Sequence, residues 1–188
     1  MKKRLFIGLL GLIGLMGEVL AQDIELTGTA YEKKEVVTVD SVTAGDLYVR
    51  AMEALSDWKG PDGKAEAGLD FHDKDAGVVN YKGKFSLGFK NTFLGDGWSR
   101  YANFTLKVKC KDGKAQVTCN VPTITAVYSR NGIKREATVA QLVEQVKKAK
   151  GAKGERGEKF LDDLKETTGM LVDAMVNRLK NGSGDDDF

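Results

Sequence analysis

The chain has 188 residues, a length that suits one domain able to bury its own core without support from metals or disulfides. Its 29 Lys and Arg residues nearly balance 27 Asp and Glu residues, and without the first 21 residues the chain carries 26 of each. Because nucleic-acid affinity comes largely from neutralising phosphates, this balance argues against a nucleic-acid-binding protein.

Residues 1–21 have the pattern of a secretory signal peptide. Cations at positions 2–4 precede an apolar run from Leu5 to Met16, and Val19 and Ala21 have the spacing of a signal-peptidase site. The apolar run is shorter than the roughly 20 residues that a membrane-spanning helix needs. No cysteine follows Ala21, so no lipid anchor is expected. We therefore expect cleavage after Ala21 and a periplasmic or secreted protein that is not a lipoprotein and has no transmembrane anchor.

The mature chain is expected to begin with a polar, extended lead-in over residues 22–34. A β-branched run from Glu35 to Val42 then predicts the first strand. Thr43 and Asp46 have capping-box spacing, which predicts a helix from about Ala44 to Trp58. Its apolar residues recur at helical spacing, so one face should pack on a sheet: Leu47, Ala51, Leu55 and Trp58.

From Gly68 to Tyr128 the pattern is that of antiparallel strands. A turn is expected at residues 73–77, a bulge at Gly83, a loop at 91–99 and a disturbance at Pro122. Alternation places one set of apolar side chains on a common face: Val79, Tyr81, Phe85, Leu87, Phe89, Ala102, Phe104, Leu106, Val108, Cys110, Ala115, Val117, Cys119 and Val121.

The two cysteines flank an Asp-Gly turn at positions 112 and 113, which is a strong hairpin signal. In that register Cys110 faces residue 115 and Cys119 faces Leu106. The two α-carbons are then roughly 13 Å apart, whereas a disulfide needs less than about 7 Å. We expect two buried thiols, with a disulfide as the alternative if the register differs.

The last third of the chain reads as helical. Thr138 and Gln141 form a second capping box, which predicts a helix over residues 138–149. The glycine-rich, charged segment that follows is expected to interrupt the helix. A strong apolar stripe predicts a second helix over residues 158–180, and the acidic tail at 181–188 is expected to be disordered.

Three stretches carry a resemblance to a known family: Thr43 to Trp58, Asp73 to Val79, and Phe104 to Lys114. They resemble the exported bacterial family of unknown function described as having a TATA-binding-protein-like (TBP-like) fold. The resemblance covers roughly residues 35–128 and implies an α+β fold with a curved antiparallel sheet in the order β-α-β(4 or more)-α and helices on one face. It brings no catalytic residues. We expect one domain over residues 35–180, with the helical extension outside the resemblance.

His72 is the only histidine, and it lies among Asp70, Asp73 and Asp75, a combination that can hold a metal. Residues 73–77 resemble the start of a calcium loop, but the twelfth position is Lys84 instead of glutamate. We therefore expect a hairpin turn and neither a metal nor a cofactor.

Ser56 and Lys59 fit the S-x-x-K pattern of penicillin-recognising serine enzymes. In those enzymes the serine starts a helix, whereas Ser56 ends the predicted one, and no K-T-G follows. We expect no enzyme. A hydrolase that depends on Ser56 or His72 stays the less favoured alternative.

The outward face of the predicted sheet is the best candidate ligand surface. Its lysines, amides, hydroxyls and one aromatic ring include Lys82, Lys84, Tyr101, Asn103, Lys107, Lys109, Gln116 and Asn120. One interpretation is a solvated face whose lysines discourage aggregation. The functional interpretation is an envelope-binding or scaffold module for an anionic glycan or glycolipid. The alternative is an interaction protein that binds a protein partner through its carboxyl-terminal amphipathic helix.

Overall fold

The computed structural model describes residues 20–21, 25–56, 65–91 and 96–182, which build an antiparallel sheet and three helices. Six strands follow the order β1-β3-β7-β6-β5-β4, while β2 pairs with β3 and β8 with β7. The strands are β1 (Leu20–Ala21), β2 (Glu25–Thr27), β3 (Ala30–Thr38), β4 (Ala65–Asp73), β5 (Val78–Asn91), β6 (Gly97–Lys111), β7 (Lys114–Tyr128) and β8 (Lys134–Thr138). The helices are α1 (Ala44–Ser56), α2 (Val139–Lys148) and α3 (Ala152–Asn181). This order confirms the predicted α+β fold class.

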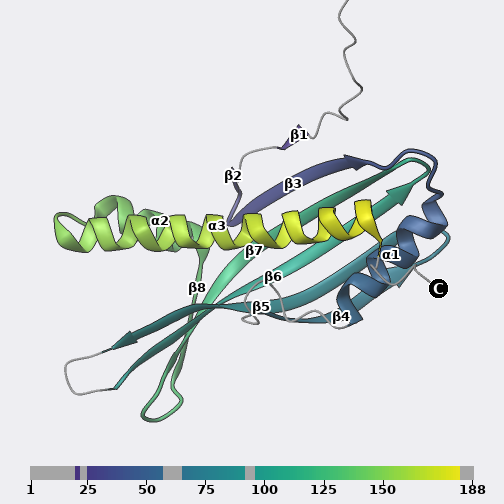
Figure 1. Cartoon of the computed structure of the whole chain (residues 1–188). Coiled ribbons are helices and arrows are strands. Elements are labelled where there is room, and N and C mark those ends of the chain that lie inside the picture. The colour runs from purple at the N-terminus through teal and green to yellow at the C-terminus, as the bar shows by residue number, and fades with distance from the viewer. Residues whose placement is uncertain (1–19, 22–24, 57–64, 92–95, 183–188) are drawn as a thin grey trace, which may run out of the picture.

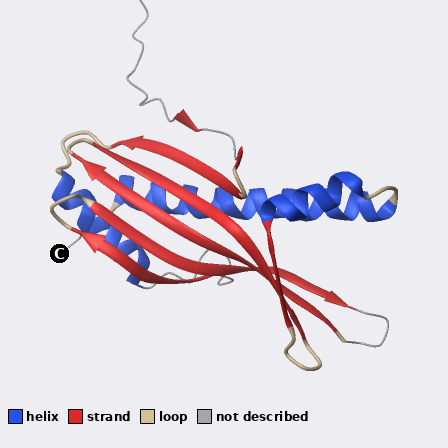
Figure 2. Ribbon diagram, turned by 180° about the vertical axis from the view of Figure 1, so that it is seen from behind, coloured by secondary structure: helices blue, strands red, loops and turns tan. Residues whose placement is uncertain are grey.

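The helices cover one face of the sheet, which we call the inner face. Figure 1 shows α3 crossing the strands and α1 beside its carboxyl-terminal end, and Figure 2 shows the opposite, outer face without helices. The core lies between sheet and helices. Alternate residues of β6 and β7 supply much of it, because every second side chain of a strand points to the same face.

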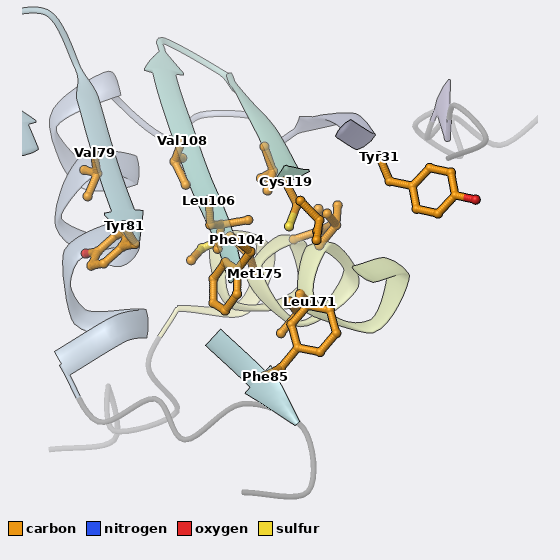
Figure 3. Packing of buried hydrophobic residues seen from close by; sticks show 14 of the residues in the cluster. Tyr31, Val79, Tyr81, Phe85, Phe104, Leu106, Val108, Cys119, Leu171 and Met175 are labelled. Carbon is orange, nitrogen blue, oxygen red and sulfur yellow. The ribbon is translucent and has the colours of Figure 1, made fainter. Parts of the chain in front are cut away.

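Side chains from four strands and α3 meet in the core (Figure 3). Phe85 and Phe104 pack with ring centroids 5.9 Å apart, and Leu106 is fully buried. From α3, Leu171 and Met175 close over them. Burial of each such side chain contributes about 1.5–3 kcal/mol, so this layer is the main source of stability.

The β6–β7 hairpin has the predicted register. Leu106 pairs with Cys119, and Cys110 pairs with Ala115. Both cysteines are buried free thiols, so the disulfide alternative is wrong. Burial raises the pKa of Cys110 to about 11 and that of Cys119 to about 12, so neither thiol ionises readily at neutral pH.

The sheet begins earlier than the sequence indicates, because β3 starts at Ala30 and not at Glu35. Its inward positions include Tyr31, which is buried, and Lys33, whose Nζ lies 3.0 Å from Asp173 Oδ1 of α3. Because polar residues occupy inner-face positions here, this part of β3 lacks the alternation of apolar and polar residues by which a sequence indicates a strand. The lead-in predicted over residues 22–34 therefore contains β2 and the start of β3.

The irregularities of the sheet differ in part from those predicted. Gly83 pairs regularly with Phe104, so a bulge there is wrong. The observed register shifts lie between Leu69 and Phe71 in β4 and between Ser86 and Phe89 in β5. A further shift in the β6–β7 pairing, where Thr105 faces Asn120 and Asn103 faces Thr123, confirms the disturbance at Pro122, which cannot donate a ladder hydrogen bond.

The carboxyl-terminal helices correct another prediction. The capping box of α2 is present, with Gln141 N donating to Thr138 Oγ1 over 3.1 Å. The predicted interruption is present at residues 149–151, between α2 and α3, but it is shorter than predicted, because residues 152–157 are helical and α3 begins at Ala152 instead of residue 158. A Cβ at Gly157 would lie 2.7 Å from Val146 Cγ2. The glycine therefore lets α3 approach α2 closely, which explains why this segment packs.

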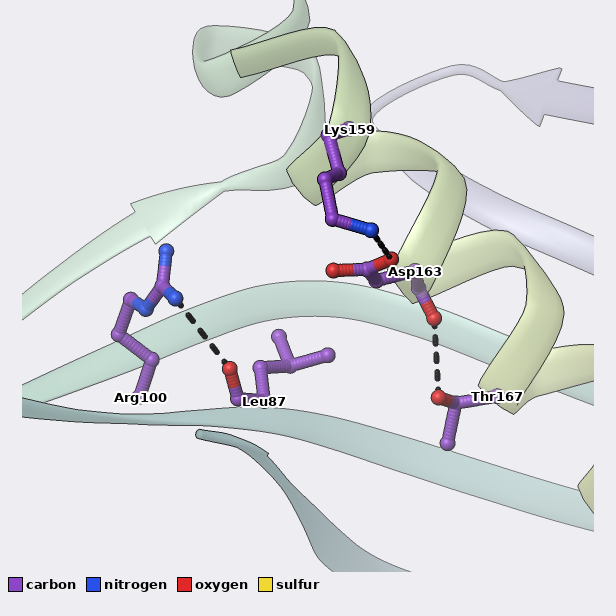
Figure 4. A network of polar contacts seen from close by, with 5 residues as sticks. All are labelled: Leu87, Arg100, Lys159, Asp163 and Thr167. Atoms are coloured by element: carbon purple, nitrogen blue, oxygen red, sulfur yellow. Dashed lines mark hydrogen bonds and ion pairs between the residues drawn. The ribbon is translucent and has the colours of Figure 1, made fainter. Parts of the chain in front are cut away.

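A cation–π contact between Arg100 of β6 and Phe160 joins the sheet to α3, and polar contacts lie on each side of it (Figure 4). Arg100 Nη2 donates to Leu87 O over 3.3 Å, and its guanidinium carbon lies 4.5 Å from the centre of the Phe160 ring. On α3, Lys159 pairs with Asp163, whose backbone oxygen accepts from Thr167. The apolar stripe of α3 is buried against the sheet, so this helix belongs to the core.

Several predictions fall outside the described residues. They are most of the signal peptide, Trp58 at the end of the first helix, and the tail from residue 183. The two described residues of the predicted signal peptide form β1, which pairs with Val36 and Glu35 of β3. Cleavage after Ala21 would remove this short pairing from the sheet edge.

Candidate functional site

The outer face of the sheet gathers the predicted ligand-surface residues. In β6, Lys107 and Lys109 are exposed while their neighbours Leu106 and Val108 are fully buried on the inner face. The same alternation applies to β5 and β7. It places all eight candidates on this face: Lys82, Lys84, Tyr101, Asn103, Lys107, Lys109, Gln116 and Asn120.

Two of the four candidate lysines have neighbours that hold them in place. Lys82 Nζ lies 3.0 Å from Asp70 Oδ1, at the irregular step of β4. Lys84 Nζ lies 5.6 Å from the centre of the Tyr101 ring, which is a cation–π contact. Because Lys82 is two-thirds exposed, its ion pair contributes little to stability and still leaves the ammonium open to a ligand.

The other two lysines differ. Within the part of the chain that the structure describes, no ion pair engages Lys107 or Lys109. Across the sheet, Lys107 lies between Asn80 and Thr118, and Lys109 has Gln116 beside it on β7. The result is a pair of ammonium groups among amides and hydroxyls, a set of groups suited to an anion that also carries hydrogen-bonding oxygens.

The amide side chains of this face form local bonds. Asn103 Nδ2 donates to Thr123 Oγ1 and Thr125 Oγ1 over 3.0 and 2.9 Å. On β7, Gln116 Nε2 donates to Thr118 Oγ1 over 3.3 Å. These bonds fix the side chains, so the face presents an ordered pattern of oxygens and amides.

A shallow, open depression of about 360 Å³ lies on β4, β5 and β6. It is lined by Ala67, Gly68, Lys82, Gly83, Lys84 and Asn103. Gly68 pairs with Lys82, and a Cβ at Gly68 would meet nothing within 4 Å. The depression therefore brings together three of the predicted residues, while Gln116 and Asn120 lie on β7, outside it.

Sequence reasoning missed two contributors to this surface, Gly68 and Asp70, while alternation along the strand does place Asn80 on this face. Asn80 Nδ2 donates to Asp70 Oδ2 over 3.0 Å. The buried Oδ1 atom of Asn80 has no hydrogen-bond partner among the described residues. The signal in the sequence that could have indicated the depression is Gly68. Its position opposite Lys82 is known only once β4 is paired with β5.

The predicted alternatives based on His72 and Ser56 lie elsewhere. His72 Nδ1 is 2.7 Å from Tyr48 Oη of α1, so the imidazole lies on the helix side of the sheet. Among the described residues, no group of three His, Cys, Asp or Glu side chains is arranged to hold a metal ion. Ser56 is the last residue of α1, and the rest of its S-x-x-K pattern lies outside the described residues.

None of the helices in the described ranges is both long and apolar enough to cross a bilayer. In α3, the longest of these helices, charged residues occupy many of the positions between those of the buried apolar stripe.

Comparison with solved structures agrees with this architecture. A TBP-like protein from Parabacteroides distasonis matches with a TM-score of 0.52 and 9% identity, over 82% of this chain and 97% of that chain. This likeness shows the fold alone. A DUF4468 family protein from Bacteroides ovatus has 15% identity and a TM-score of 0.44, over 78% of this chain and 90% of that chain. A comparison with curated proteins finds none that matches.

Residues 34–124 match the family model described as "Domain of unknown function (DUF4468) with TBP-like fold". The match runs from β3 to the distal part of β7, so it includes α1 and the whole outer-face depression but neither α2 nor α3. Residues 34–124 therefore match this family of unknown function with a TBP-like fold, as the resemblance of the sequence predicts.

Proposed function

We propose that this protein is a non-catalytic binding module of the bacterial cell envelope or exterior, whose outer sheet face binds an anionic glycan or the head group of a phosphorylated glycolipid. One observation carries the proposal. Four lysines, Lys82, Lys84, Lys107 and Lys109, share the one sheet face that no described helix covers.

The spacing of these lysines suits an extended, repeating anion. Residues two apart on a strand are roughly 7 Å apart, and neighbouring strands are about 4.8 Å apart. The lysines of β5 and β6 therefore form a small two-dimensional array. Thr105 and Thr118 lie beside Lys82 and Lys107 across the strands, and hydroxyls of this kind can bond to sugar oxygens.

The composition of the face favours binding over catalysis. General acid–base or nucleophilic chemistry needs a nucleophile within hydrogen-bond reach of a base. The outer-face side chains are instead lysines, amides, hydroxyls, an aromatic ring and the carboxylate of Asp70, which Lys82 and Asn80 already engage. His72 bonds to Tyr48 on the helix side. The alternative through the carboxyl-terminal helix needs a free apolar stripe, whereas α3 buries its stripe in the core.

Export is part of the proposal and rests on the leader pattern of residues 1–21. Amino-terminal sequencing of protein recovered from the periplasm or medium of a native host should give Gln22 as the first residue.

The binding proposal is tested with a sulfated dextran resin as the anionic glycan and neutral dextran as its control. Wild-type protein should be retained on the sulfated resin only and should elute with salt, because exposed charges are screened. The variant with Lys82, Lys84, Lys107 and Lys109 changed to Gln should bind at least about tenfold more weakly.

The matched control changes four exposed lysines at the α2–α3 turn to Gln: Lys147, Lys148, Lys150 and Lys153. It alters the net charge by the same amount and should leave retention near the wild-type value. Equal losses in both variants would mean attraction to charge in general, and absence of retention in the wild type would contradict the proposal directly.

A further inference from the structure

The end of the sheet farthest from α1 projects beyond the helices (Figures 1 and 2). We call it the hairpin end and define it as residues 89–90, 96–98 and 128–135. It contains the end of β5, the start of β6 and the β7–β8 turn. Its β7–β8 part, residues 128–135, lies outside the family match of residues 34–124, whereas residues 89–90 and 96–98 lie within it. The hairpin end does not include the four lysines of the proposed ligand face.

The β7–β8 turn is well ordered. Tyr128 N donates to Ile133 O over 2.9 Å, and Gly132 N donates to Tyr128 O over 2.9 Å. The neighbouring strand start is fixed to it, since Ser129 N donates to Gly97 O and Gly97 N donates to Ser129 Oγ. The turn therefore presents its side chains in fixed positions.

Two large apolar side chains are exposed on this end. Ile133, in the turn, is 51% exposed, and Phe89, near the end of β5, is 47% exposed. Single exposed apolar residues are normal on protein surfaces. What distinguishes these two is their place at a projecting end and the residues that surround them.

Cations surround the apolar side chains. Lys90, Arg130, Lys134 and Arg135 are all exposed, and the acidic residues nearby in sequence are Asp96 and Glu136. The Arg130 side chain is 71% exposed and lies 3.8 Å from Asp96, at the limit of an ion pair, so its charge is hardly neutralised. The end therefore carries a local excess of positive charge on a nearly neutral chain.

An aromatic pair lies directly behind the cations. Trp98 and Tyr128 pack with ring centroids 5.1 Å apart and ring planes tilted by 35°, and the guanidinium of Arg135 lies 5.0 Å from the centre of the Trp98 ring. Tyr128 Oη also donates to Asp96 Oδ2 over 3.1 Å. Trp and Tyr have an apolar body and a polar tip, the combination that favours the boundary between lipid and water.

We infer that the hairpin end docks on the surface of an anionic lipid bilayer. Ile133 and Phe89 enter the head-group region, while Lys90, Arg130, Lys134 and Arg135 contact lipid phosphates. A protein partner fits less well, because a stable protein interface buries roughly 800 Å² on each side around a packed centre, and two side chains on a projecting turn supply no such centre. A bilayer needs no matching shape.

Flotation with vesicles tests this inference. Wild-type protein should bind vesicles containing roughly 30% phosphatidylglycerol in phosphatidylcholine, should not bind pure phosphatidylcholine, and should be released by high salt. Changing both Phe89 and Ile133 to Ser, or Arg130, Lys134 and Arg135 to Gln, should weaken binding at least about tenfold.

Matched controls separate this end from the rest of the surface. Val36→Ser removes another exposed apolar side chain, and the triple change of Lys147, Lys148 and Lys153 to Gln removes three charges elsewhere. Both should bind like the wild type. The inference is overturned if wild-type protein does not float with anionic vesicles, or if either control loses as much binding as the hairpin-end variants.

A second measurement reports contact directly, without relying on loss of binding. The introduced cysteine of Ile133→Cys can be labelled selectively with an environment-sensitive fluorophore, because the two native thiols are buried. Bromine-bearing lipids should quench it, whereas the same label on Thr38→Cys, at the opposite end of the sheet, should be unaffected. Equal quenching at both positions, or none at position 133, contradicts the inference. Retention on sulfated dextran is measured separately, so the ligand-face proposal stands or falls on its own.

Discussion

The two faces of the sheet are built from alternate residues of the same strands, and they differ in almost every property. On β6, Leu106 is fully buried beneath the helices while the next residue, Lys107, is exposed. The inner face supplies the packing that stabilises the fold. The outer face can therefore vary in charge and hydrogen bonding at little cost to folding, which suits a surface used for recognition.

Strand β3 departs from this division on its inner side. Lys33 and Glu35 point toward α3, and Glu35 is 4% exposed. Lys33 is paired with Asp173, and the Cβ position of Gly169 lies 3.5 Å from Lys33 Nζ, so α3 makes room for the ammonium group. On this strand Lys33 therefore has an ion-pair partner on α3, whereas burial and the charge of Asp173 disfavour the ionised form of Glu35.

The largest expected effect separates the two faces by adjacent substitutions. Leu106→Ala should lower the free energy of unfolding by about 2–5 kcal/mol, because it leaves a cavity in the core. Lys107→Ala should change it by no more than about 0.5 kcal/mol. Urea denaturation measures both. Similar losses in the two variants would show that the outer face also carries stability.

Thiol reactivity gives a second contrast, between Cys119 and its outward neighbour Thr118. Native wild-type protein at mildly alkaline pH should react with a disulfide reagent at least about 100-fold more slowly than Thr118→Cys, since burial raises the pKa of Cys110 to about 11 and of Cys119 to about 12. Unfolding without reductant should release both native thiols. Rapid reaction of the native protein, or absence of free thiols after unfolding, would contradict the buried-thiol arrangement.

The smallest expected effect concerns Glu35, the buried carboxyl group on the inner side of β3. Burial, and then the charge of Asp173, raises the pKa of Glu35, while Lys33 and Lys180 lower it in part. A carboxyl whose pKa is raised on folding stabilises the protein fully below its ordinary value of 4.5 and loses that contribution as pH rises through the folded pKa.

Glu35→Gln should therefore be more stable than wild type at neutral pH, and the difference should shrink as pH falls through the raised pKa of Glu35 and be lost below 4.5. Thermal unfolding across this range measures it. Glu32→Gln, on the outer side of the same strand, removes one charge and serves as the matched control. If the difference in stability between Glu35→Gln and the wild type does not change with pH, the titration of Glu35 is ruled out as its cause.

The hairpin register and the identity of the faces could be predicted because both are local. An Asp-Gly turn sets the pairing of Cys110 with Ala115, and period-two alternation then assigns every side chain of β6 and β7 to a face. The eight candidate residues were placed together for the same reason. The depression at Gly68 was missed because it depends on the pairing of β4 with β5 and on a bulge that no turn signal marks.

The sequence by itself determined the order of the helices and of the strands from β3 to β7, the helix caps at Thr43 and Thr138, and the division of the strands into apolar and polar faces, because periodicity and capping act over a few residues. It did not indicate β1, β2 or β8. Only the tertiary structure decided that β3 begins at Ala30 and that α3 continues through a glycine-rich segment. In both places the decisive partner belongs to another element: Asp173 of α3 for Lys33, 140 residues along the chain, and Val146 of α2 for Gly157, across the break between the two helices. Long-range packing of this kind overrides local propensity.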